Sequence, residues 1–280
     1  MPELPEVETV CSGLRPAIAR RKLASIATFR RDLRIPFPKN LPVLKGDTVT
    51  AVTRRAKYAL VHFTSGRVMI IHLGMSGRLT VQRKNQQMPR QKHDHMLMTF
   101  DNGTSVVFND PRRFGLVDLT TEDGLAAHRF FCHLGPEPLD SAFNARTLAA
   151  ALAGKKIAIK LAIMDQRVVV GVGNIYASEA LYRAGIDPRR AAGTLDKKEI
   201  ARLVPAIKTV LKQAIAAGGS SLRDYVQTDG ELGYFQHGFK VYDRAGDTCE
   251  RCRRKGHKKP CILKITQGGR STFYCARQQQ

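Results

Sequence analysis

Apolar and polar residues alternate along most of the N-terminal part of the chain, a pattern typical of half-buried β-strands. The alternating runs are Ser25–Phe29, Thr48–Thr53, Tyr58–Phe63, Val68–His72, Leu79–Gln82, Met96–Phe100 and Ser105–Phe108. Asn102-Gly103, between the last two runs, is a strong signal for a tight hairpin turn. Before the strands, apolar residues at helical spacing from Val7 to Ile18 predict an amphipathic helix. Many short strands with tight turns predict an antiparallel β-sandwich or barrel.

The pattern becomes helical beyond Leu119. Leu134–Leu139 has the proline- and glycine-rich composition of a hinge, and helical spacing follows at Thr147–Leu152, Ile157–Met164, Ile175–Ala184 and Lys197–Ala217. Pro205 lies inside the last of these segments and is expected to kink it or divide it in two. The sequence therefore predicts an α+β protein with a β-sandwich domain at 1–134, a hinge at 135–142, a helical domain at 143–238 and a cysteine-containing hairpin at 239–280.

The chain is strongly basic for its length. Its 280 residues include 46 lysines and arginines against 24 aspartates and glutamates, a formal net charge of +22. Such a surplus suits a polyanion, either a nucleic acid or an anionic membrane surface. No apolar run approaches the roughly 20 residues that span a bilayer, and the N-terminus lacks the basic and apolar regions of an export signal. We therefore expect a nucleic-acid partner, no membrane association and a cytoplasmic location.

Four of the six cysteines crowd into the last part of the chain. Without an export signal, this crowding points to a metal site before disulfides. Cys249-x2-Cys252 forms a turn that places two thiolates on one tetrahedral Zn²⁺, and Cys275 begins a second such turn, in which Gln278 stands where a cysteine is expected. The candidates for the fourth ligand are Cys261, His257 and Gln278. The alternative is that these thiols bind no metal.

Arginine and apolar residues occupy turns that suit contact with DNA. Gly268-Gly269-Arg270 predicts a hairpin tip that presents a guanidinium to a phosphate. The loop 110–115 follows a strand and carries Arg112 and Phe114, which can push a guanidinium and a ring into a base stack. Met75 is a second candidate for such a wedge. The alternative is that Phe114 and Met75 are ordinary core residues.

The first residues, Met1-Pro2-Glu3, offer a nucleophile that needs no side chain. A proline in second position leaves Met1 open to removal, so the mature chain is expected to start with the secondary amine of Pro2. An α-amino group titrates near about pH 8, so it is less protonated at neutral pH than a lysine. A neutral amine can attack a sugar carbon and form an iminium, with Glu3 and Glu6 nearby for proton transfer. The alternative is structural: Pro5 begins a helix whose dipole favours these glutamates.

The same motifs, in the same order, occur in bacterial formamidopyrimidine-DNA glycosylases (8-oxoguanine DNA glycosylases), which the chain resembles along essentially its whole length. The matching segments are Pro-Glu-Leu-Pro-Glu-Val-Glu-Thr at 2–9, Lys57-Tyr58, His-Leu-Gly-Met-Ser-Gly at 72–77, Lys-His-Asp-His at 92–95, Asp-Pro-Arg-Arg-Phe-Gly at 110–115, the segment 170–179 and Gly-Arg-Ser-Thr-Phe-Tyr-Cys at 269–275. The resemblance implies a β-sandwich with flanking helices, a helix–two-turn–helix domain and a β-hairpin zinc finger with one structural Zn²⁺. The chain departs from the family at Gln278, where the family pattern ends in a cysteine.

The resemblance implies a base-excision-repair enzyme, a DNA glycosylase and AP lyase that removes oxidised purines from damaged double-stranded DNA. Pro2 would form the Schiff base, and Glu3 would act as general acid–base. Lys57 would serve β-elimination and Arg270 δ-elimination, while the segment Ser220–His237 would cap the extruded base. The DNA-binding residues that the resemblance implies are Glu6, Met75, His93, Arg112, Phe114, Lys155, Lys160 and Asn174.

Two other functions are compatible with the sequence. Endonuclease VIII-like enzymes, which prefer oxidised pyrimidines, also begin with Pro-Glu, although the residues from Leu4 to Thr9 resemble the formamidopyrimidine branch. A non-catalytic zinc-finger protein that binds damaged DNA would explain the altered second turn at Gln278. Substrate preference distinguishes the first alternative, and the absence of strand cleavage distinguishes the second. In each case we expect a monomer associated with the nucleoid.

Overall fold

The computed structural model describes residues 1–86, 88–220, 228 and 233–280. The chain forms two compact units. The first combines Met1–Cys132 with Ile215–Gln236, and the second combines His133–Ala214 with His237–Gln280. The segment that the resemblance assigns to lesion capping, Ser220–His237, lies mostly outside the described residues.

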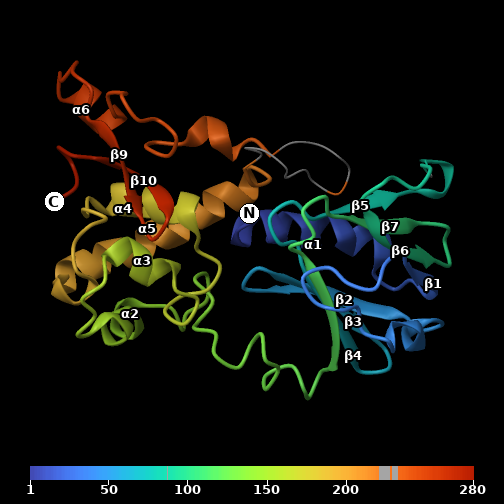
Figure 1. The fold of residues 1–280 in the computed structure, drawn as a ribbon. Helices are drawn as coiled ribbons and strands as arrows, with labels where there is room; N and C mark the ends of the chain where they lie inside the picture. Colours follow the sequence, from blue (N-terminus) through green and yellow to red (C-terminus); the bar gives the residue numbers. More distant parts are fainter. Residues whose placement is uncertain (87, 221–227, 229–232) are drawn as a thin grey trace. The chain divides into compact units, whose positions relative to one another are not determined.

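Two four-stranded antiparallel sheets form the centre of the first unit (Figure 1). One sheet has the order β1-β6-β7-β5, with the bounds Leu23–Thr28, Asp94–Phe100, Ser105–Asn109 and Arg78–Gln82. The other has the order β2-β3-β4-β8, with the bounds Val49–Arg55, Tyr58–Phe63, Arg67–His72 and Leu116–Thr121. Every alternating run of the sequence overlaps one of these strands, so the predicted β-sandwich is confirmed.

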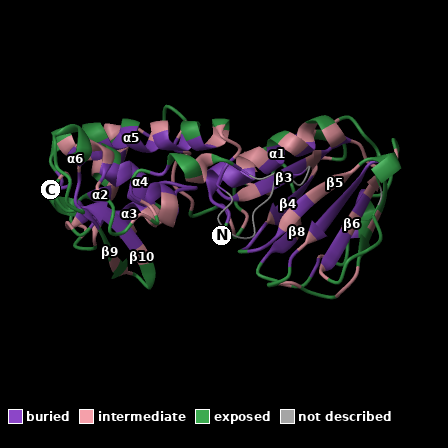
Figure 2. Cartoon of the chain, turned by 90° about the horizontal axis from the view of Figure 1, so that it is seen from above, coloured by how far each residue is buried: buried purple, intermediate pink, exposed green. Residues whose placement is uncertain are grey.

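A single apolar core lies between these two sheets. Val61 and Met69 enter it from one sheet, and Met98 and Phe108 enter it from the other, all with 0% exposure. Figure 2 shows buried residues along the strands of both sheets. Each such side chain stabilises the fold by about 1.5–3 kcal/mol relative to an exposed position. The 3₁₀ turns η1 (Leu41–Leu44) and η2 (Lys84–Gln86) lie between strands.

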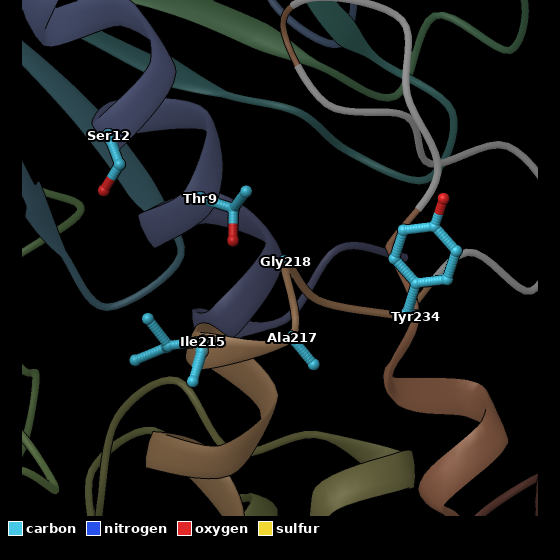
Figure 3. Close-up of a pocket in the computed structure, with 7 residues that line it drawn as sticks. Thr9, Ser12, Ile215, Ala217, Gly218 and Tyr234 are labelled. Atoms are coloured by element: carbon cyan, nitrogen blue, oxygen red, sulfur yellow. The ribbon is translucent and has the colours of Figure 1, made fainter.

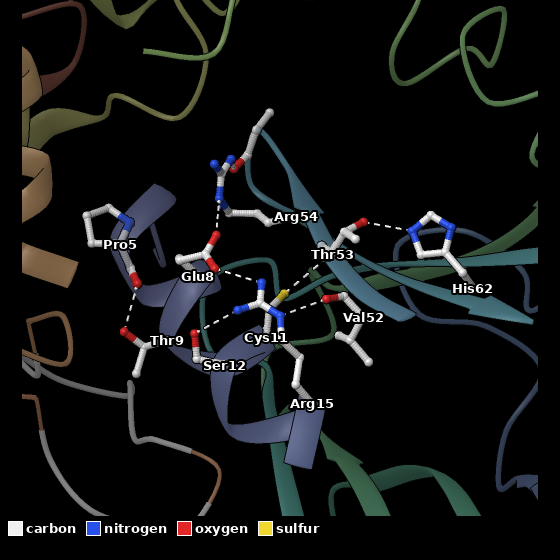
Figure 4. A network of polar contacts seen from close by, with 11 residues as sticks. Pro5, Glu8, Thr9, Cys11, Ser12, Arg15, Val52, Thr53, Arg54 and His62 are labelled. Atoms are coloured by element: carbon white, nitrogen blue, oxygen red, sulfur yellow. Dashed lines mark hydrogen bonds and ion pairs between the residues drawn. The ribbon is translucent and has the colours of Figure 1, made fainter. Parts of the chain in front are cut away.

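Helix α1 (Leu4–Ile18) packs its apolar face against this sandwich, as the helical spacing predicts. Polar contacts on its other residues fix it to β2 (Figure 4). Glu8 accepts hydrogen bonds from Arg15 at 2.8 Å and from Arg54 at 2.9 Å. Arg15 Nε also donates to the Val52 carbonyl at 2.8 Å. These contacts hold the middle of α1 against β2.

Helices and a β-hairpin form the second unit (Figure 1). The helices are α2 (Ala145–Leu152), α3 (Ile159–Met164), α4 (Asn174–Ala184) and α5 (Lys197–Ala216), whose last residues belong to the first unit. The short helix α6 (Glu250–Arg254) precedes the hairpin of β9 (Ile262–Gln267) and β10 (Arg270–Cys275), and 3₁₀ turns occupy Ala192–Thr194 (η3) and Phe235–Gly238 (η4). None of the described helices is both long and apolar enough to cross a membrane.

Helix α5 runs without interruption through Pro205, so Pro205 does not divide it in two, and the other expected effect, a kink, stays a prediction. Pro205 lies on the exposed side of the helix, where water can bond the carbonyl that loses its backbone partner. Buried residues on the opposite side, including Leu203 and Ile207, continue the apolar face across the proline. A capping box begins α5: the Glu199 N–H donates to Asp196 Oδ1 at 2.7 Å, and the Asp196 N–H donates to Glu199 Oε2 at 2.8 Å.

Candidate active site

The N-terminal residues are buried at the start of α1. Pro2 is buried, and Glu3 and Glu6 are only 3% and 2% exposed. Glu3 is the N-cap residue and forms a capping box with Glu6, in which the Glu3 N–H donates to Glu6 Oε2 at 2.8 Å. Pro5 occupies the first turn, which suits its fixed φ. The residues that begin the helix therefore also fix the position of Pro2.

Glu6 also contacts a distant segment of the first unit. Its other oxygen, Oε1, accepts the Ser220 N–H at 2.8 Å in a buried contact between residues 214 positions apart. Each carboxylate oxygen therefore accepts a backbone N–H, an arrangement that offsets the cost of burying the group. Glu6 thus joins the chain terminus to the beginning of the predicted capping segment.

An open pocket of about 410 Å³ lies beside α1 in the first unit (Figure 3). Thr9 and Ser12 of α1 line it together with residues 215–218 and Tyr234. Its polar groups include the hydroxyls of these side chains. Pro2, Glu3 and Glu6 do not line this pocket, so we assign it no role in catalysis.

Lys57 lies in the two-residue turn between β2 and β3 and is 8% exposed. The preceding Ala56 has a φ of 53°, a left-handed conformation that costs energy in a residue with a side chain. His72 is electrostatically coupled to this lysine: burial, and then the charges of Lys57 and Arg34, lower the pKa of His72 to about 4. The neutral imidazole accepts the Gly74 N–H on Nδ1 at 3.0 Å. His72 therefore fixes the start of the loop that carries Met75.

Buried Asp110 joins the two loops that carry the wedge candidates. Its Oδ1 accepts a hydrogen bond from Ser76 Oγ at 2.5 Å, and its Oδ2 accepts the Gly115 N–H at 2.8 Å. Ser76 Oγ in turn accepts the Arg112 N–H at 3.1 Å. Because Asp110 is 0% exposed, its two hydrogen bonds form out of contact with water. The two loops are thus fixed to each other through one carboxylate.

The wedge candidates themselves are exposed. Met75 is 36% exposed and Phe114 46%, so the alternative that they are core residues is wrong. The guanidinium carbon of Arg112 lies 5.2 Å from the centroid of the Phe114 ring. Gly74 lets the loops meet, because a Cβ there would lie 2.3 Å from the Phe114 carbonyl carbon. The structure therefore brings Met75, Arg112 and Phe114 onto two adjoining loops.

In the second unit, a buried lysine ties the start of α4 to the hairpin. Lys160 is 0% exposed, and its Nζ donates to Asn174 Oδ1 at 2.5 Å, Thr272 Oγ1 at 2.7 Å and the Ser271 carbonyl at 3.2 Å. Asn174 Nδ2 donates to the same Ser271 carbonyl at 2.9 Å. Three acceptors offset the cost of burying the ammonium. Lys160 is therefore a positioning residue in this structure, and its contact with DNA stays a prediction.

Glu179, inside α4, holds the chain that leads into the cysteine hairpin. Glu179 is 3% exposed, and its carboxylate accepts the N–H groups of Lys240, Val241 and Tyr242 at 2.8–3.1 Å. Burial raises the pKa of Glu179, and the three backbone N–H groups oppose the rise. The Tyr242 hydroxyl accepts a hydrogen bond from Asn174 Nδ2 at 3.3 Å. Glu179 thus supports Asn174 through Tyr242.

Arg270 is exposed at the tip of the hairpin. Gly268 and Gly269 form the turn with φ values of 54° and 72°, both positive as a two-residue type I′ turn requires. The strands pair in register from Arg270 with Gln267 to Cys275 with Ile262. The predicted hairpin is confirmed, and it presents the guanidinium away from the strand ends that carry the cysteines.

Those cysteines form a buried cluster. The Sγ atoms of Cys249, Cys252, Cys261 and Cys275 all lie within 4.8 Å of one another. A tetrahedral Zn²⁺ with Zn–S bonds of about 2.3 Å places its sulfurs about 3.8 Å apart. The Sγ–Sγ distances from Cys275 to Cys249 and to Cys252 are 3.5 and 3.7 Å. The four thiols therefore fit one tetrahedral ion, as in a zinc finger.

The known proteins and family models that match this chain carry the same description. The model of the formamidopyrimidine-DNA glycosylase N-terminal domain matches residues 1–117, and that of the formamidopyrimidine-DNA glycosylase H2TH domain matches residues 134–226. The chain is 52% identical to the formamidopyrimidine-DNA glycosylase of Acidiphilium cryptum and 50% identical to that of Paracoccus denitrificans, over 100% of each chain. This chain belongs to the formamidopyrimidine-DNA glycosylase family.

Solved structures of formamidopyrimidine-DNA glycosylases (Fpg) are similar over the whole chain. A point mutant of the Lactococcus lactis Fpg in complex with Fapy-dG-containing DNA matches with a TM-score of 0.89 at 33% identity, covering 100% of both chains. The MutM (Fpg) protein of Thermus thermophilus matches with a TM-score of 0.85 at 33% identity, covering 99% of this chain and 98% of that one. The predicted α+β fold, with its β-sandwich, helix–two-turn–helix domain and finger-like hairpin, is confirmed.

The Fpg residues singled out from the sequence fall in both units of this chain. The first unit holds Pro2, Glu3, Glu6, Lys57, Met75, His93, Arg112 and Phe114. The second holds Lys155, Lys160, Asn174, Arg270 and the four clustered cysteines. The side chains of His93 and Lys155 are half-buried.

Sequence reasoning missed the residues that support these groups. Asp110 and Glu179 lie within matched motifs, but no role was assigned to either. An acidic residue among apolar neighbours is a signal for a buried carboxylate with backbone partners, and Glu179 shows that pattern within residues 176–181. Asp110, between Asn109 and Pro111, does not show it. Ser76, a small polar residue, has no comparable signal because its partner lies on another loop.

Protonation of His72 is expected to destabilise the first unit in mild acid. Its pKa is about 4 in the fold, against about 6.5 in an unfolded chain. Between these values the unfolded chain binds more protons, so the free energy of unfolding falls as the pH drops from about 6.5 towards 4, by about 2–3 kcal/mol. His72→Asn does not titrate and keeps an acceptor for the Gly74 N–H, so it should lose less stability.

Denaturant unfolding of both proteins at pH 7 and pH 4.5 measures this difference. His257→Asn, which changes an exposed imidazole, is the matched control and should follow the unmodified chain. The prediction fails if the stability gap between the unmodified chain and His72→Asn is the same at both pH values.

Proposed function

We propose that this chain is a bifunctional DNA glycosylase and AP lyase that removes oxidised purines, such as 8-oxoguanine and formamidopyrimidines, from double-stranded DNA in base excision repair. The observation that carries this proposal is the buried Pro2-Glu3 terminus, held by Glu6, in a chain of the Fpg family. The solved relatives support the substrate class: one is bound to Fapy-dG-containing DNA and another, MutM, to DNA containing carbocyclic 8-oxo-G.

The proposed nucleophile is the secondary amine of Pro2, which removal of Met1 exposes. Its lone pair attacks C1′ of the damaged nucleotide, and the bond from C1′ to the base breaks with its electrons leaving on the base. Glu3 moves the protons that departure of the base and opening of the sugar ring require. The result is an iminium between the Pro2 nitrogen and C1′. Part of the Pro2 amine is unprotonated near neutral pH, and this neutral form is the one that can attack C1′.

The iminium makes both strand cleavages possible because it acidifies the C2′ proton. Loss of that proton expels the 3′ phosphate by β-elimination, and loss of a second proton expels the 5′ phosphate by δ-elimination. We assign proton transfer in the first step to Lys57 and in the second to Arg270. Lys57 lies in a buried turn of the first unit, and Arg270 lies at an exposed hairpin tip of the second.

The wedge residues are proposed to open the duplex. Met75, Arg112 and Phe114 would fill the gap left by the extruded base, with Arg112 facing the orphan cytosine. Base extrusion costs a few kcal/mol, which the inserted side chains offset. The other proposed DNA contacts are His93, Lys155 and Asn174, and the buried Lys160 would act by holding Asn174 in place. The net charge of +22 adds attraction that carries no sequence information.

We also propose that the cysteine cluster holds one structural Zn²⁺, with Cys249, Cys252 and Cys275 among its ligands. The ion would contribute folding energy rather than a chemical step. It would fasten the strand ends of the hairpin whose tip carries Arg270. We further propose that the enzyme acts as a monomer on nucleoid DNA in the cytoplasm, because its substrate is the chromosome.

Blocking the terminal amine should abolish covalent chemistry. One lysine inserted between Met1 and Pro2 prevents removal of Met1 and leaves the proline nitrogen in a peptide bond. The unmodified chain should form a borohydride-trapped adduct with an 8-oxoguanine duplex, located at Pro2 by peptide mass spectrometry, and the insertion variant should form none. Lesion binding by both proteins is the control for folding, and a thymine glycol duplex tests base preference. An adduct on a lysine, or equal trapping by both chains, contradicts the proposal.

Arg270→Ala should separate the two eliminations. We expect base excision and β-elimination to continue, with δ-elimination slowed by about 100-fold, the usual contribution of a general acid–base group. Denaturing gels measure the ratio of 3′ unsaturated aldehyde to 3′ phosphate ends. Lys264→Ala, which removes an exposed charge from the same hairpin, is the control and should leave the ratio unchanged. Equal loss of both eliminations in Arg270→Ala would remove the assignment.

A further inference from the structure

The geometry points to Cys261 as the fourth ligand of the metal, and we propose that it replaces the second cysteine of the C-terminal turn. This inference rests on the proposal that the cluster binds Zn²⁺. The Cys261 Sγ lies in the same group as the sulfurs of Cys249, Cys252 and Cys275. All four side chains are buried, as closed structural sites require. The site would then be a four-thiolate site with ligand spacings unlike those of two Cys-x-x-Cys turns.

Cys261 occupies a fixed place at the strand ends of the hairpin. It immediately precedes β9, and its carbonyl accepts the Ala276 N–H at 3.0 Å, directly beside the registered pair of Cys275 and Ile262. Its Sγ accepts the Cys249 N–H at 3.1 Å. A backbone N–H aimed at sulfur favours a thiolate, because it stabilises the negative charge. Two ligands from neighbouring strands and two from the Cys249–Cys252 turn would therefore surround one ion.

The hydrogen bonds of the Gln278 side chain are not those of a metal ligand. Its Nε2 donates to Cys252 Sγ at 3.4 Å, so the amide directs a donor at the cluster. Its Oε1, the only atom of the side chain that can bind a cation, accepts from Lys255 Nζ at 3.3 Å. His257 is exposed and lies outside the group of clustered ligand atoms. Gln278 therefore supports a ligand sulfur by hydrogen bonding, and Cys261 supplies the coordinating atom.

The last residues of the chain, Gln279 and Gln280, make hydrogen bonds instead of binding the metal. Gln279 is 3% exposed, with its Oε1 accepting the Cys275 N–H at 2.7 Å and its Nε2 donating to the Ile186 carbonyl at 2.8 Å. The Gln280 carbonyl accepts the Asp187 N–H at 3.1 Å. The end of the chain thus fastens the hairpin to the segment after α4 by hydrogen bonds, independently of the metal.

Metal binding by single-residue variants of the full chain tests the assignment. The unmodified chain, loaded with Co²⁺ under reducing conditions, should give the absorption of a four-thiolate complex. Cys261→Ser should weaken binding of Zn²⁺ by more than about 100-fold in chelator competition and lose thiolate charge-transfer intensity. Gln278→Ala should weaken binding by about tenfold, as loss of a supporting hydrogen bond does, but keep the four-thiolate spectrum. His257→Ala and Cys132→Ser, a cysteine outside the cluster, should match the unmodified chain.

A second variant keeps the test decisive if Cys261→Ser disturbs folding. Cys261→His retains a ligand atom, so the Co²⁺ spectrum should change to that of three thiolates and one nitrogen, with its d–d bands at higher energy. A four-thiolate spectrum in that variant, or a changed ligand set in Gln278→Ala or His257→Ala, overturns the assignment while leaving the zinc site itself intact. Absence of bound metal in the unmodified chain overturns both the zinc proposal and this one.

Discussion

In the proposed mechanism, the position of the Pro2 amine depends on the carboxylate of Glu6. The proposed nucleophile has no side chain to direct it, so its place would be set by the backbone that follows. Glu6 accepts the Glu3 N–H with one oxygen and the Ser220 N–H with the other, and both bonds are buried. The Glu6 carboxylate therefore fixes the helix start, the terminus and the beginning of the capping segment. The contact of Glu8 with Arg54 holds α1 against the sheet.

Buried charges play the same part in the second unit. The Lys160 ammonium bonds Asn174 and two residues of β10, and the Glu179 carboxylate bonds the backbone that leads into the finger. Groups of this kind are costly to bury unless every hydrogen bond is made, so they tolerate only one arrangement of the surrounding chain. Such an arrangement suits a unit that must present Arg270 at the tip of a narrow hairpin.

Periodicity predicted the elements because the alternation of apolar and polar residues follows burial, most directly from Met96 to Phe100, where buried and half-buried positions alternate. Motif recognition likewise predicted the hairpin at Arg270, since two glycines readily adopt the positive φ values of its turn. The continuous helix through Pro205 could not be predicted, because the sequence does not state which side of a helix faces water. The bonds of Asp110, Glu179 and Glu6 could not be predicted, because their partners are backbone groups brought close only by folding.

The rate of iminium formation in Glu6→Gln tests the central claim most directly. Glutamine has only one acceptor oxygen, so one of the two buried N–H contacts is lost and the amine moves relative to C1′. Single-turnover trapping on an abasic-site duplex should show a rate lower by at least about tenfold, with DNA binding nearly unchanged, since small misplacements of a nucleophile are costly. Glu8→Gln, a change in the same helix, should lower stability and leave the rate unchanged. A Glu6→Gln variant that reacts as fast as the unmodified chain would contradict the account.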